Sequence, residues 1–308
     1  MISIIMRTHN SEAFLEEAIE SVLSQTYSGW ELIVSDDAST DRTITIASGY
    51  ARRDGRIRLI PGEHLGAAEN GNRCLRHARH PWIAVLDSDD VALPDRLSLS
   101  LDAAQAHPEV VLWGGRAILI DRYGKRLRQA VVGPRSHEEY EQHMVSGRVI
   151  YVMSPTAMFR RDLALELGGY DHAMDGAEDV ELMTRLAERG PVMTLDHELA
   201  LYRIHGASTS STLFNKQQNV FDFLDLRAKL RLSGEDITMA EYRQRLREQP
   251  TRQRIQQTAR SIGRAQYRAA VVNLAERRPF RAAGNGLLAV LFDPTHAYHR
   301  LRNRLSSN

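Results

Sequence analysis

Residues 82–90 read Trp82-Ile83-Ala84-Val85-Leu86-Asp87-Ser88-Asp89-Asp90, an apolar run that ends in three carboxylates. A short run rich in Val, Ile and Leu is typical of a central parallel strand, and ligands of open α/β sheets bind beyond the carboxyl ends of such strands. Asp87 and Asp89 stand two residues apart on extended chain, so they face the same way and offer hard oxygen ligands to Mg2+ or Mn2+. The stretch therefore predicts a ligand site at the end of a buried strand.

The Asp-x-Asp spacing is weak evidence by itself. With 39 acidic residues among 308, about five such triplets are expected by chance. The alternative interpretation is a solvated acidic turn that caps the helix expected after Pro94. The rest of the chain has to decide between a ligand site and a cap.

Strand and helix patterns alternate on both sides of this stretch. Strands are expected over residues 2–7, 31–35 and 56–60, and each is followed by a helical pattern. This alternation predicts an α/β fold with a mostly parallel, Rossmann-like sheet flanked by helices. Two further strands are expected on either side of Gly114-Gly115, and residues 122–150 are polar and irregular. Beyond residue 210 only helical patterns occur, which predicts a domain over 1–210 and a helical, Arg-rich extension over 211–308.

Bulk composition indicates a globular protein of the cytoplasm. Hydrophobic residues make up 43% and charged residues 26% of the chain, which are ordinary values. The single cysteine, Cys74, excludes an internal disulfide framework and a Cys-based zinc site. No basic leader is expected before the first strand, and no apolar run approaches the roughly 18 to 20 residues that span a membrane.

The charge is unevenly distributed along the chain. From Thr251 onward eleven Arg oppose only Glu276 and Asp293, a net charge of +9, so residues 1–250 carry −8 of the overall +1. One interpretation is a solvated helical surface that packs on the acidic body. The other is peripheral contact with an anionic membrane, through Arg residues beside the apolar stretch 287–292. Nucleic acid is not expected as a partner, because the body is acidic and contains no nucleic-acid-binding module.

An ordered series of short motifs resembles the GT-A inverting glycosyltransferases of family 2. The motifs are Thr8-His9-Asn10, Ser21-Val22-Leu23-Ser24-Gln25-Thr26, the run from Trp30 to Asp41, Leu86-Asp87-Ser88-Asp89-Asp90, Leu167-Gly168-Gly169-Tyr170-Asp171, Glu178-Asp179 and Tyr202-Arg203-Ile204-His205. The resemblance covers about residues 1–210. The family commonly has Arg-Asn where this chain has Glu69-Asn70, so no cationic contact to a diphosphate is expected from that helix.

The resemblance implies metal-dependent transfer of a sugar from a nucleotide sugar, by default UDP-linked, to a saccharide or lipid-linked hydroxyl in polysaccharide or glycoconjugate synthesis. It implies roles for eight side chains: Thr8, Asn10, Asp37 (nucleobase) and Asp87 (ribose) for the donor, Asp89 and His205 for Mn2+ or Mg2+, Asp179 as the catalytic base, and Glu178 as its neighbour. The alternative roles are a turn for Thr8 and Asn10, helix capping for Glu178-Asp179 and the acids after the second strand, and a structural role for His205.

Three other classes of protein are alternatives to this interpretation. A nicotinamide-dependent enzyme would have G-x-G-x-x-G after the first strand, where Arg7-Thr8-His9-Asn10 stands instead. A sugar-phosphate nucleotidyltransferase would need a Gly-rich basic loop at the same place. A noncatalytic nucleotide- or sugar-binding module remains the third alternative, although the presence of both acidic motifs in one chain favours turnover.

Overall fold

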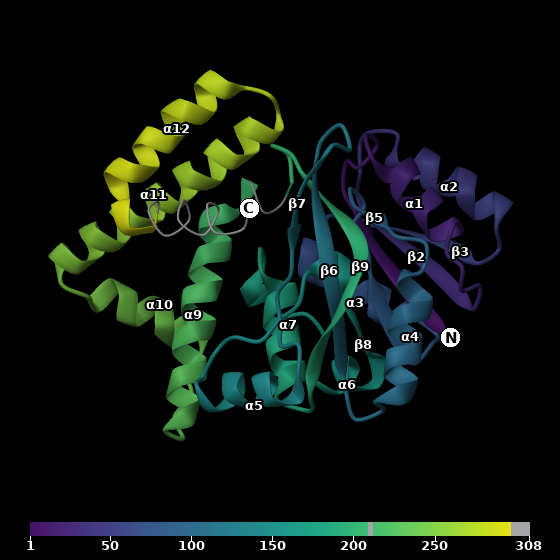
Figure 1. The fold of residues 1–308 in the computed structure, drawn as a ribbon, viewed down its shortest axis with the longest axis horizontal. Helices are drawn as coiled ribbons and strands as arrows, with labels where there is room; N and C mark the ends of the chain where they lie inside the picture. Colours follow the sequence, from purple (N-terminus) through teal and green to yellow (C-terminus); the bar gives the residue numbers. More distant parts are fainter. Residues whose placement is uncertain (209–211, 297–308) are drawn as a thin grey trace. The chain divides into compact units, whose positions relative to one another are not determined.

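The computed structural model of the chain describes residues 1–208 and 212–296 (Figure 1). Its internal contacts divide the chain into two compact units, Met1–Leu119 with Arg126–Arg203, and Ile120–Lys125 with Ile204–Asn308. The main division therefore follows Arg203, close to the boundary expected at residue 210. Three arginines of the Arg-rich end, Arg300, Arg302 and Arg304, lie outside the described residues.

The first unit begins with alternating strands and helices, as the sequence pattern predicts. They are β1 (Ile2–Thr8), α1 (Leu15–Leu23), β2 (Trp30–Asp37), α2 (Thr43–Arg53), β3 (Ile57–Gly62), α3 (Ala67–His77) and β4 (Trp82–Val85). β1 pairs in parallel with β2 and with β4, and β2 pairs in parallel with β3. The carboxyl ends of β1, β2 and β4 therefore lie at the same edge of the sheet.

The second half of the sheet is antiparallel. Its strands are β5 (Val91–Ala92), β6 (Leu112–Asp121), β7 (Arg126–Ala130), β8 (Met158–Arg160) and β9 (Val192–Ile204). The helices that alternate with them along the chain are α4 (Arg96–Ala106), α5 (His137–Val145), α6 (Arg161–Glu166) and α7 (Glu178–Ala187). The strand order is β3-β2-β1-β4-β8-β6-β9-β5, with β7 paired to β6. β8 runs antiparallel to both β4 and β6, so the parallel half continues into the antiparallel half through β8.

Two local predictions are wrong. Gly114 and Gly115 do not separate two strands but lie inside the single strand β6. A Cβ atom at Gly114 would lie 2.5 Å from Cβ of Val152, and one at Gly115 would overlap the side chain of Leu199. The two glycines therefore permit close packing against the strand instead of making a turn. The polar segment 122–150 is also more regular than expected, because it contains β7 and α5.

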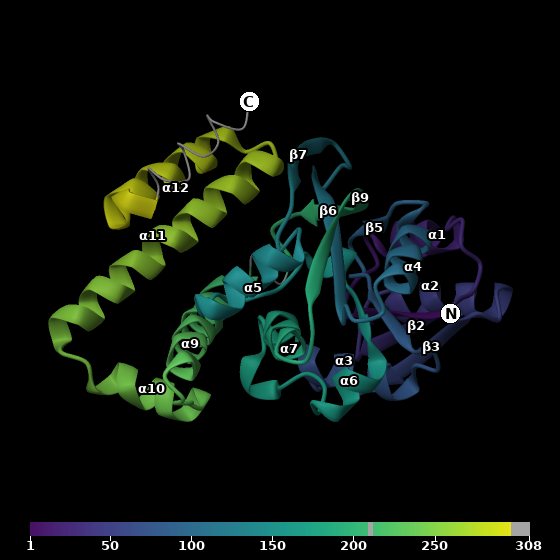
Figure 2. The same cartoon turned by 60° about the horizontal axis from the view of Figure 1, so that its bottom comes forward.

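Helices cover both faces of the sheet (Figures 1 and 2). Alternate residues of a strand point to opposite faces. Ile4 accordingly belongs to a core cluster with residues of α1, α2 and α4, whereas Ile5 belongs to a second cluster with residues of α3, α6 and α7. Both side chains are almost completely buried. This double coverage explains the continuous apolar runs of the central strands.

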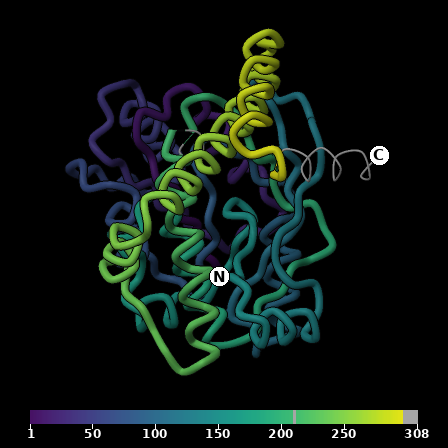
Figure 3. Tube along the Cα trace, turned by 90° about the vertical axis from the view of Figure 1, so that its left-hand side faces the viewer, coloured from purple at the N-terminus to yellow at the C-terminus, as the bar shows by residue number. Residues whose placement is uncertain are grey.

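The second unit is mainly helical. Its long helices are α9 (Phe214–Leu232), α10 (Met239–Glu248), α11 (Thr251–Ala275) and α12 (Pro279–Phe292), and they follow one another along the trace in Figure 3. α10 begins with a capping box between Thr238 and Glu241. α12 folds back along α11, and a Cβ atom at Gly263 would lie 2.6 Å from Cβ of Asp293. Among the described helices, none is both long and apolar enough to cross a membrane.

The glycine pair after α6 allows a matched test of backbone strain. Gly168 and Gly169 have φ angles of 84° and 73°, a conformation that costs an L residue about 1–2 kcal/mol. A Cβ atom at Gly168 meets nothing within 4 Å, whereas one at Gly169 would overlap Oδ1 of Asn72. That oxygen accepts a hydrogen bond from the backbone N–H of Tyr170 at 2.7 Å.

We therefore expect Gly169→Ala to lower the free energy of unfolding by about 1–3 kcal/mol more than Gly168→Ala, because only the first disturbs the Asn72 hydrogen bond. Urea unfolding of both variants measures the difference. Equal losses in the two variants would contradict the structural account of this turn.

Candidate active site

The acidic stretch after β4 is held in place by two arginines. Oδ1 of Asp87 accepts from Nη2 of Arg7 at 3.3 Å. The carbonyl oxygen of Asp89 accepts from Nε of Arg203 at 2.8 Å, and Oδ1 of Asp90 accepts from the Arg203 backbone N–H at 2.7 Å. The carboxylates of Asp87 and Asp90 and the backbone of Asp89 are therefore held between β1 and the end of β9.

The electrostatics of this stretch fit a divalent cation. Burial raises the pKa of Asp87, with Arg7 opposing this shift and Asp89 adding to it. The pKa of Asp90 is also well above its ordinary value, because of burial and of the neighbouring Asp89 and Asp87. In the described part of the chain, Oδ2 of Asp90 is buried without a hydrogen-bond partner. Neighbouring carboxylates with excess negative charge suit Mg2+ or Mn2+, and the assignment of this stretch to a metal ion stays a prediction.

Arg7 of β1 joins the two acidic motifs of the sequence. Its Nη1 donates to Oε1 of Glu178 at 2.5 Å, while its Nη2 donates to Asp87. Its guanidinium carbon lies 5.6 Å from the ring centroid of Tyr170. Burial disfavours the charged guanidinium, but Glu178 and Asp87 hold the pKa of Arg7 well above its ordinary value. The sequence analysis missed this residue, and the available signal was a basic side chain in an otherwise apolar strand.

The first turn of α7 contains the two predicted catalytic carboxylates. Glu178 is 4% exposed, and Oε2 accepts from the backbone N–H of Gly176 at 2.9 Å while Oε1 accepts from Arg7. Both oxygens of Glu178 are thus engaged in fixing the loop before the helix. Asp179 is partly buried, and burial together with the charge of Glu178 raises the pKa of Asp179 to about 6, with Arg7 opposing the shift. With both oxygens of Glu178 engaged, Asp179 is the candidate proton acceptor of this turn.

Thr8 contacts the end of β2, and Asn10 contacts the loop that follows this strand. The hydroxyl of Thr8 is buried and donates to Oδ1 of Asp36 at 3.0 Å. Oδ1 of Asn10 accepts from the backbone N–H of Thr40 at 2.9 Å, and Asn10 itself has a φ of 51°. These contacts give both residues a structural role, and their predicted contact with a donor stays a prediction.

Asp37 binds the loop before α3. Its Oδ1 accepts from the backbone N–H of Leu65 at 2.8 Å and its Oδ2 from that of Gly66 at 3.2 Å. The Asp37 carboxylate also lies 2.9 Å from Nδ1 of His64. Together with His9 these side chains bring three candidate metal-ligand atoms within 4.8 Å in the described residues. The assignment of Asp37 to a nucleobase stays a prediction.

His205 belongs to the second unit, whereas Asp89 belongs to the first. The backbone carbonyl of His205 accepts from the hydroxyl of Ser208 at 2.9 Å. The predicted role of the His205 imidazole as a metal ligand beside Asp89 stays a prediction.

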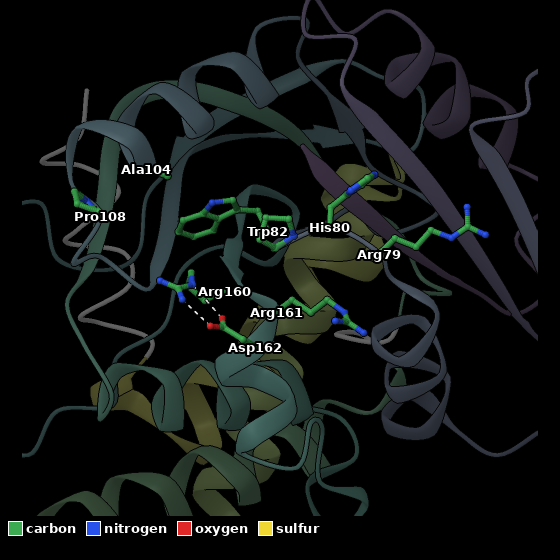
Figure 4. Close-up of a pocket in the computed structure, with 9 residues that line it drawn as sticks. Arg79, His80, Trp82, Ala104, Pro108, Arg160, Arg161 and Asp162 are labelled. Carbon is green, nitrogen blue, oxygen red and sulfur yellow. Dashed lines mark hydrogen bonds and ion pairs between the residues drawn. The ribbon is translucent and has the colours of Figure 1, made fainter.

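A pocket of about 490 Å3 lies at the other end of β4 (Figure 4). Trp82 lines the pocket and begins β4, whereas Asp87 follows the end of that strand. Arg160 and Asp162 in its wall form an ion pair at 2.6 Å. The pocket is therefore separate from the acidic site, and we assign it no role.

The amino-acid sequence matches the family model Glycosyl transferase family 2 over residues 3–168. It is 34% identical to EpsE of Bacillus subtilis, a proposed glycosyltransferase, over 61% of this chain and 67% of EpsE. It is 36% identical over 120 residues, 39% of this chain and 47% of the relative, to WfgD of Escherichia coli, named UDP-Glc:alpha-D-GlcNAc-diphosphoundecaprenol beta-1,3-glucosyltransferase.

Two solved structures resemble the fold of the whole chain. Residues 1-349 of S. aureus TarS in complex with UDP have a TM-score of 0.58 at 16% identity, over 97% of this chain and 91% of that TarS fragment. Mannosyltransferase PcManGT from Pyrobaculum calidifontis, in complex with GDP-Man and Mn2+, has a TM-score of 0.54 at 18% identity, over 99% and 79% of the two chains. The fold is that of a GT-A glycosyltransferase, as the sequence predicts. The chain belongs to glycosyltransferase family 2.

The buried cation of Arg7 should be essential for stability. We expect Arg7→Met to lower the free energy of unfolding by about 2–4 kcal/mol, because it leaves the buried carboxylate of Glu178 and the partly buried carboxylate of Asp87 without their cation. Adding Glu178→Gln to Arg7→Met should recover part of this loss, since one of the two charges is removed. Urea unfolding measures both effects.

Arg52 is exposed on α2, so Arg52→Met is a matched control that should stay within about 0.5 kcal/mol of the natural protein. An Arg7→Met variant as stable as this control would contradict the bridging role of Arg7.

Proposed function

We propose that this glycosyltransferase catalyses metal-dependent, inverting transfer of a sugar from a nucleotide sugar to an acceptor hydroxyl. The observation that carries the proposal is the Arg7 bridge, which joins Asp87 of the Asp-x-Asp motif to Glu178, the neighbour of Asp179. A metal-binding motif and a carboxylate with a raised pKa thus belong to one electrostatic network. A binding module without turnover would have no need of the second carboxylate.

Asp179 is the proposed catalytic base. Its carboxylate accepts the proton of the acceptor hydroxyl as the hydroxyl oxygen attacks the anomeric carbon and the bond to the nucleoside diphosphate breaks. This single displacement inverts the anomeric configuration. Glu178 orients the first turn of α7 through Gly176 and Arg7.

Asp89 and His205 are the proposed ligands of Mg2+ or Mn2+. When bound, such an ion neutralises the negative charge of the leaving diphosphate. The crowded carboxylates after β4 support this assignment, and the Mn2+ in the PcManGT complex is consistent with it.

The donor is proposed to be a UDP-sugar that binds along the carboxyl ends of β1, β2 and β4. Asp37 would recognise the nucleobase and Asp87 the ribose, and Thr8 and Asn10 are the further residues proposed to contact the donor. The UDP in the TarS complex and the UDP-Glc in the name of WfgD support the choice of nucleotide.

The acceptor is proposed to be a saccharide or lipid-linked sugar used in polysaccharide or glycoconjugate synthesis. The name of WfgD contains a diphosphoundecaprenol-linked acceptor, which supports the lipid-linked case. An enzyme with such an acceptor would work as a peripheral protein at the cytoplasmic face of the cell membrane.

Metal dependence can be tested by calorimetry with UDP. We expect the natural protein to bind UDP at least about tenfold more tightly with Mn2+ or Mg2+ than with excess chelator, because a cation held by Asp89 would offset the negative charge of the diphosphate. Asp89→Ala should bind UDP equally under both conditions. Asp102 is an exposed acid on α4, so Asp102→Ala should keep the metal dependence. Equal affinity of the natural protein with metal and with chelator would remove the metal from the proposal.

The base is tested by transfer rate measured together with donor affinity. We expect Asp179→Asn to lower kcat by about 100- to 10,000-fold with little change in donor affinity, because only proton transfer is lost. Glu178→Gln should lower kcat by a smaller factor, since the Glu178 carboxylate orients the helix. NMR should show inversion at the anomeric carbon of the product. Retention of configuration, or an Asp179→Asn variant within a few-fold of the natural enzyme, would exclude this role.

The pH profile provides a second measurement of the same assignment. Burial raises the pKa of Asp179 to about 6, so the base is protonated and inactive below that pH. The kcat of the natural enzyme should therefore fall about tenfold per pH unit below pH 6 and be level above it. The residual activity of Asp179→Asn should lack this acidic limb, whereas a level profile down to pH 5 in the natural enzyme would contradict the assignment.

A further inference from the structure

α12 exposes its large apolar residues and buries its small ones. The side chains of Phe280, Leu287 and Leu291 are 93%, 74% and 71% exposed, and their spacing of seven and four residues places them on one face of the helix. Ala282 and Ala289, on the opposite face, are only 5% and 2% exposed. A surface helix of a globular protein normally has the reverse arrangement, with its apolar face toward the core.

Polar contacts fix the orientation of α12 against α11. Oδ1 of Asn285 accepts from Nδ2 of Asn273 at 3.0 Å, and Nδ2 of Asn285 donates to Oε1 of Gln266 at 2.5 Å. Asn285 therefore belongs to the face that packs on α11, together with the buried alanines. The outward direction of the apolar face is a consequence of this packing.

The charge exposed on α11 and α12 has one sign. α11 contains no acidic residue. Of the two acids in this region, Asp293 is 7% exposed and Glu276 is engaged by the backbone N–H of Gly206 at 2.8 Å and by Arg278 at 3.0 Å. The exposed ionic side chains of the two helices and their connection are all arginines: Arg252, Arg254, Arg260, Arg277, Arg278 and Arg281.

We infer that the outer face of α12 docks on the surface of an anionic lipid bilayer. Phe280, Leu287 and Leu291 would enter the boundary between headgroups and acyl chains, while the arginines contact lipid phosphates. α12 has 14 residues and is about 21 Å long, so it would lie in the membrane plane.

The positive charge of α11 and α12 favours a lipid bilayer over two other partners of this surface. A second copy of the chain would bring two arginine-rich surfaces together, which is unfavourable. A nucleic acid would satisfy the arginines but would leave the exposed Phe280 and Leu287 without a role. The inference rests on the proposed function only in that a lipid-linked acceptor would be presented at the same membrane surface.

The test is vesicle flotation of the full chain with phosphatidylcholine alone and with added phosphatidylglycerol, at low and high salt. We expect binding that requires phosphatidylglycerol and weakens with salt, because headgroup attraction is screened. Leu287→Gln with Leu291→Gln should weaken binding at least about tenfold. Val145 is 75% exposed on α5 of the first unit, so Val145→Gln should leave binding unchanged.

Several outcomes would overturn the inference. One is the absence of salt-sensitive vesicle binding by the natural chain, and another is an unaltered vesicle affinity of the Leu287/Leu291 double variant. A third is a natural chain that is dimeric in solution and becomes monomeric in the double variant. Circular dichroism confirms that each variant folds. The affinity for UDP, measured in parallel, should be the same in all variants. A variant that loses vesicle binding but keeps UDP binding tests the membrane role of α12 alone. Loss of UDP binding with intact vesicle binding would instead count against the proposed transferase site.

Discussion

The active site depends on one buried cation. The guanidinium of Arg7, in strand β1, donates from Nη2 to Oδ1 of Asp87 at 3.3 Å and from Nη1 to Oε1 of Glu178 at 2.5 Å. Taking a guanidinium out of water is costly, and two carboxylates at close range offset that cost only while the geometry is kept. The same contacts limit the rise in the pKa of Asp179, which Arg7 lowers and Glu178 raises. Stability and the proposed proton transfer by Asp179 would therefore be coupled through the side chain of Arg7.

The rest of the first unit holds this ion network in position. Asn72 of α3 binds both the N–H and the carbonyl of Tyr170, and Tyr170 in turn lies beside the guanidinium of Arg7. Gly169 leaves room for the Asn72 amide, which gives the glycine pair after α6 a packing reason. On the other side, Arg203 binds Asp90 and the carbonyl of Asp89. The antiparallel half of the sheet thus contributes to a site whose acidic residues begin at the parallel half.

The second unit follows a different rule of packing. In the first unit, apolar residues are buried between sheet and helices, and this arrangement stabilises the fold. In α12 the small residues Ala282 and Ala289 are buried and the large apolar residues face outward. Such a surface gains free energy only when another phase or molecule covers it. The exposed arginines of the same unit are the reason why an anionic membrane is the proposed partner of this surface.

The sequence by itself determined the βα order from β1 to β4 and placed Asp87 and Asp89 after a strand, because apolar periodicity and strand ends are local properties of the chain. Asp179 was singled out only by its resemblance to a family motif. The partners of those acids were decided only by the tertiary structure. Arg7 and Glu178 are brought together by strand order and loop packing, which leave no local pattern. For the same reason the sequence predicts a turn at Gly114, whereas in the structure Gly114 makes room for the side chain of Val152. Long-range packing and the pairing of buried charges depend on which elements become neighbours, and no window of sequence contains that information.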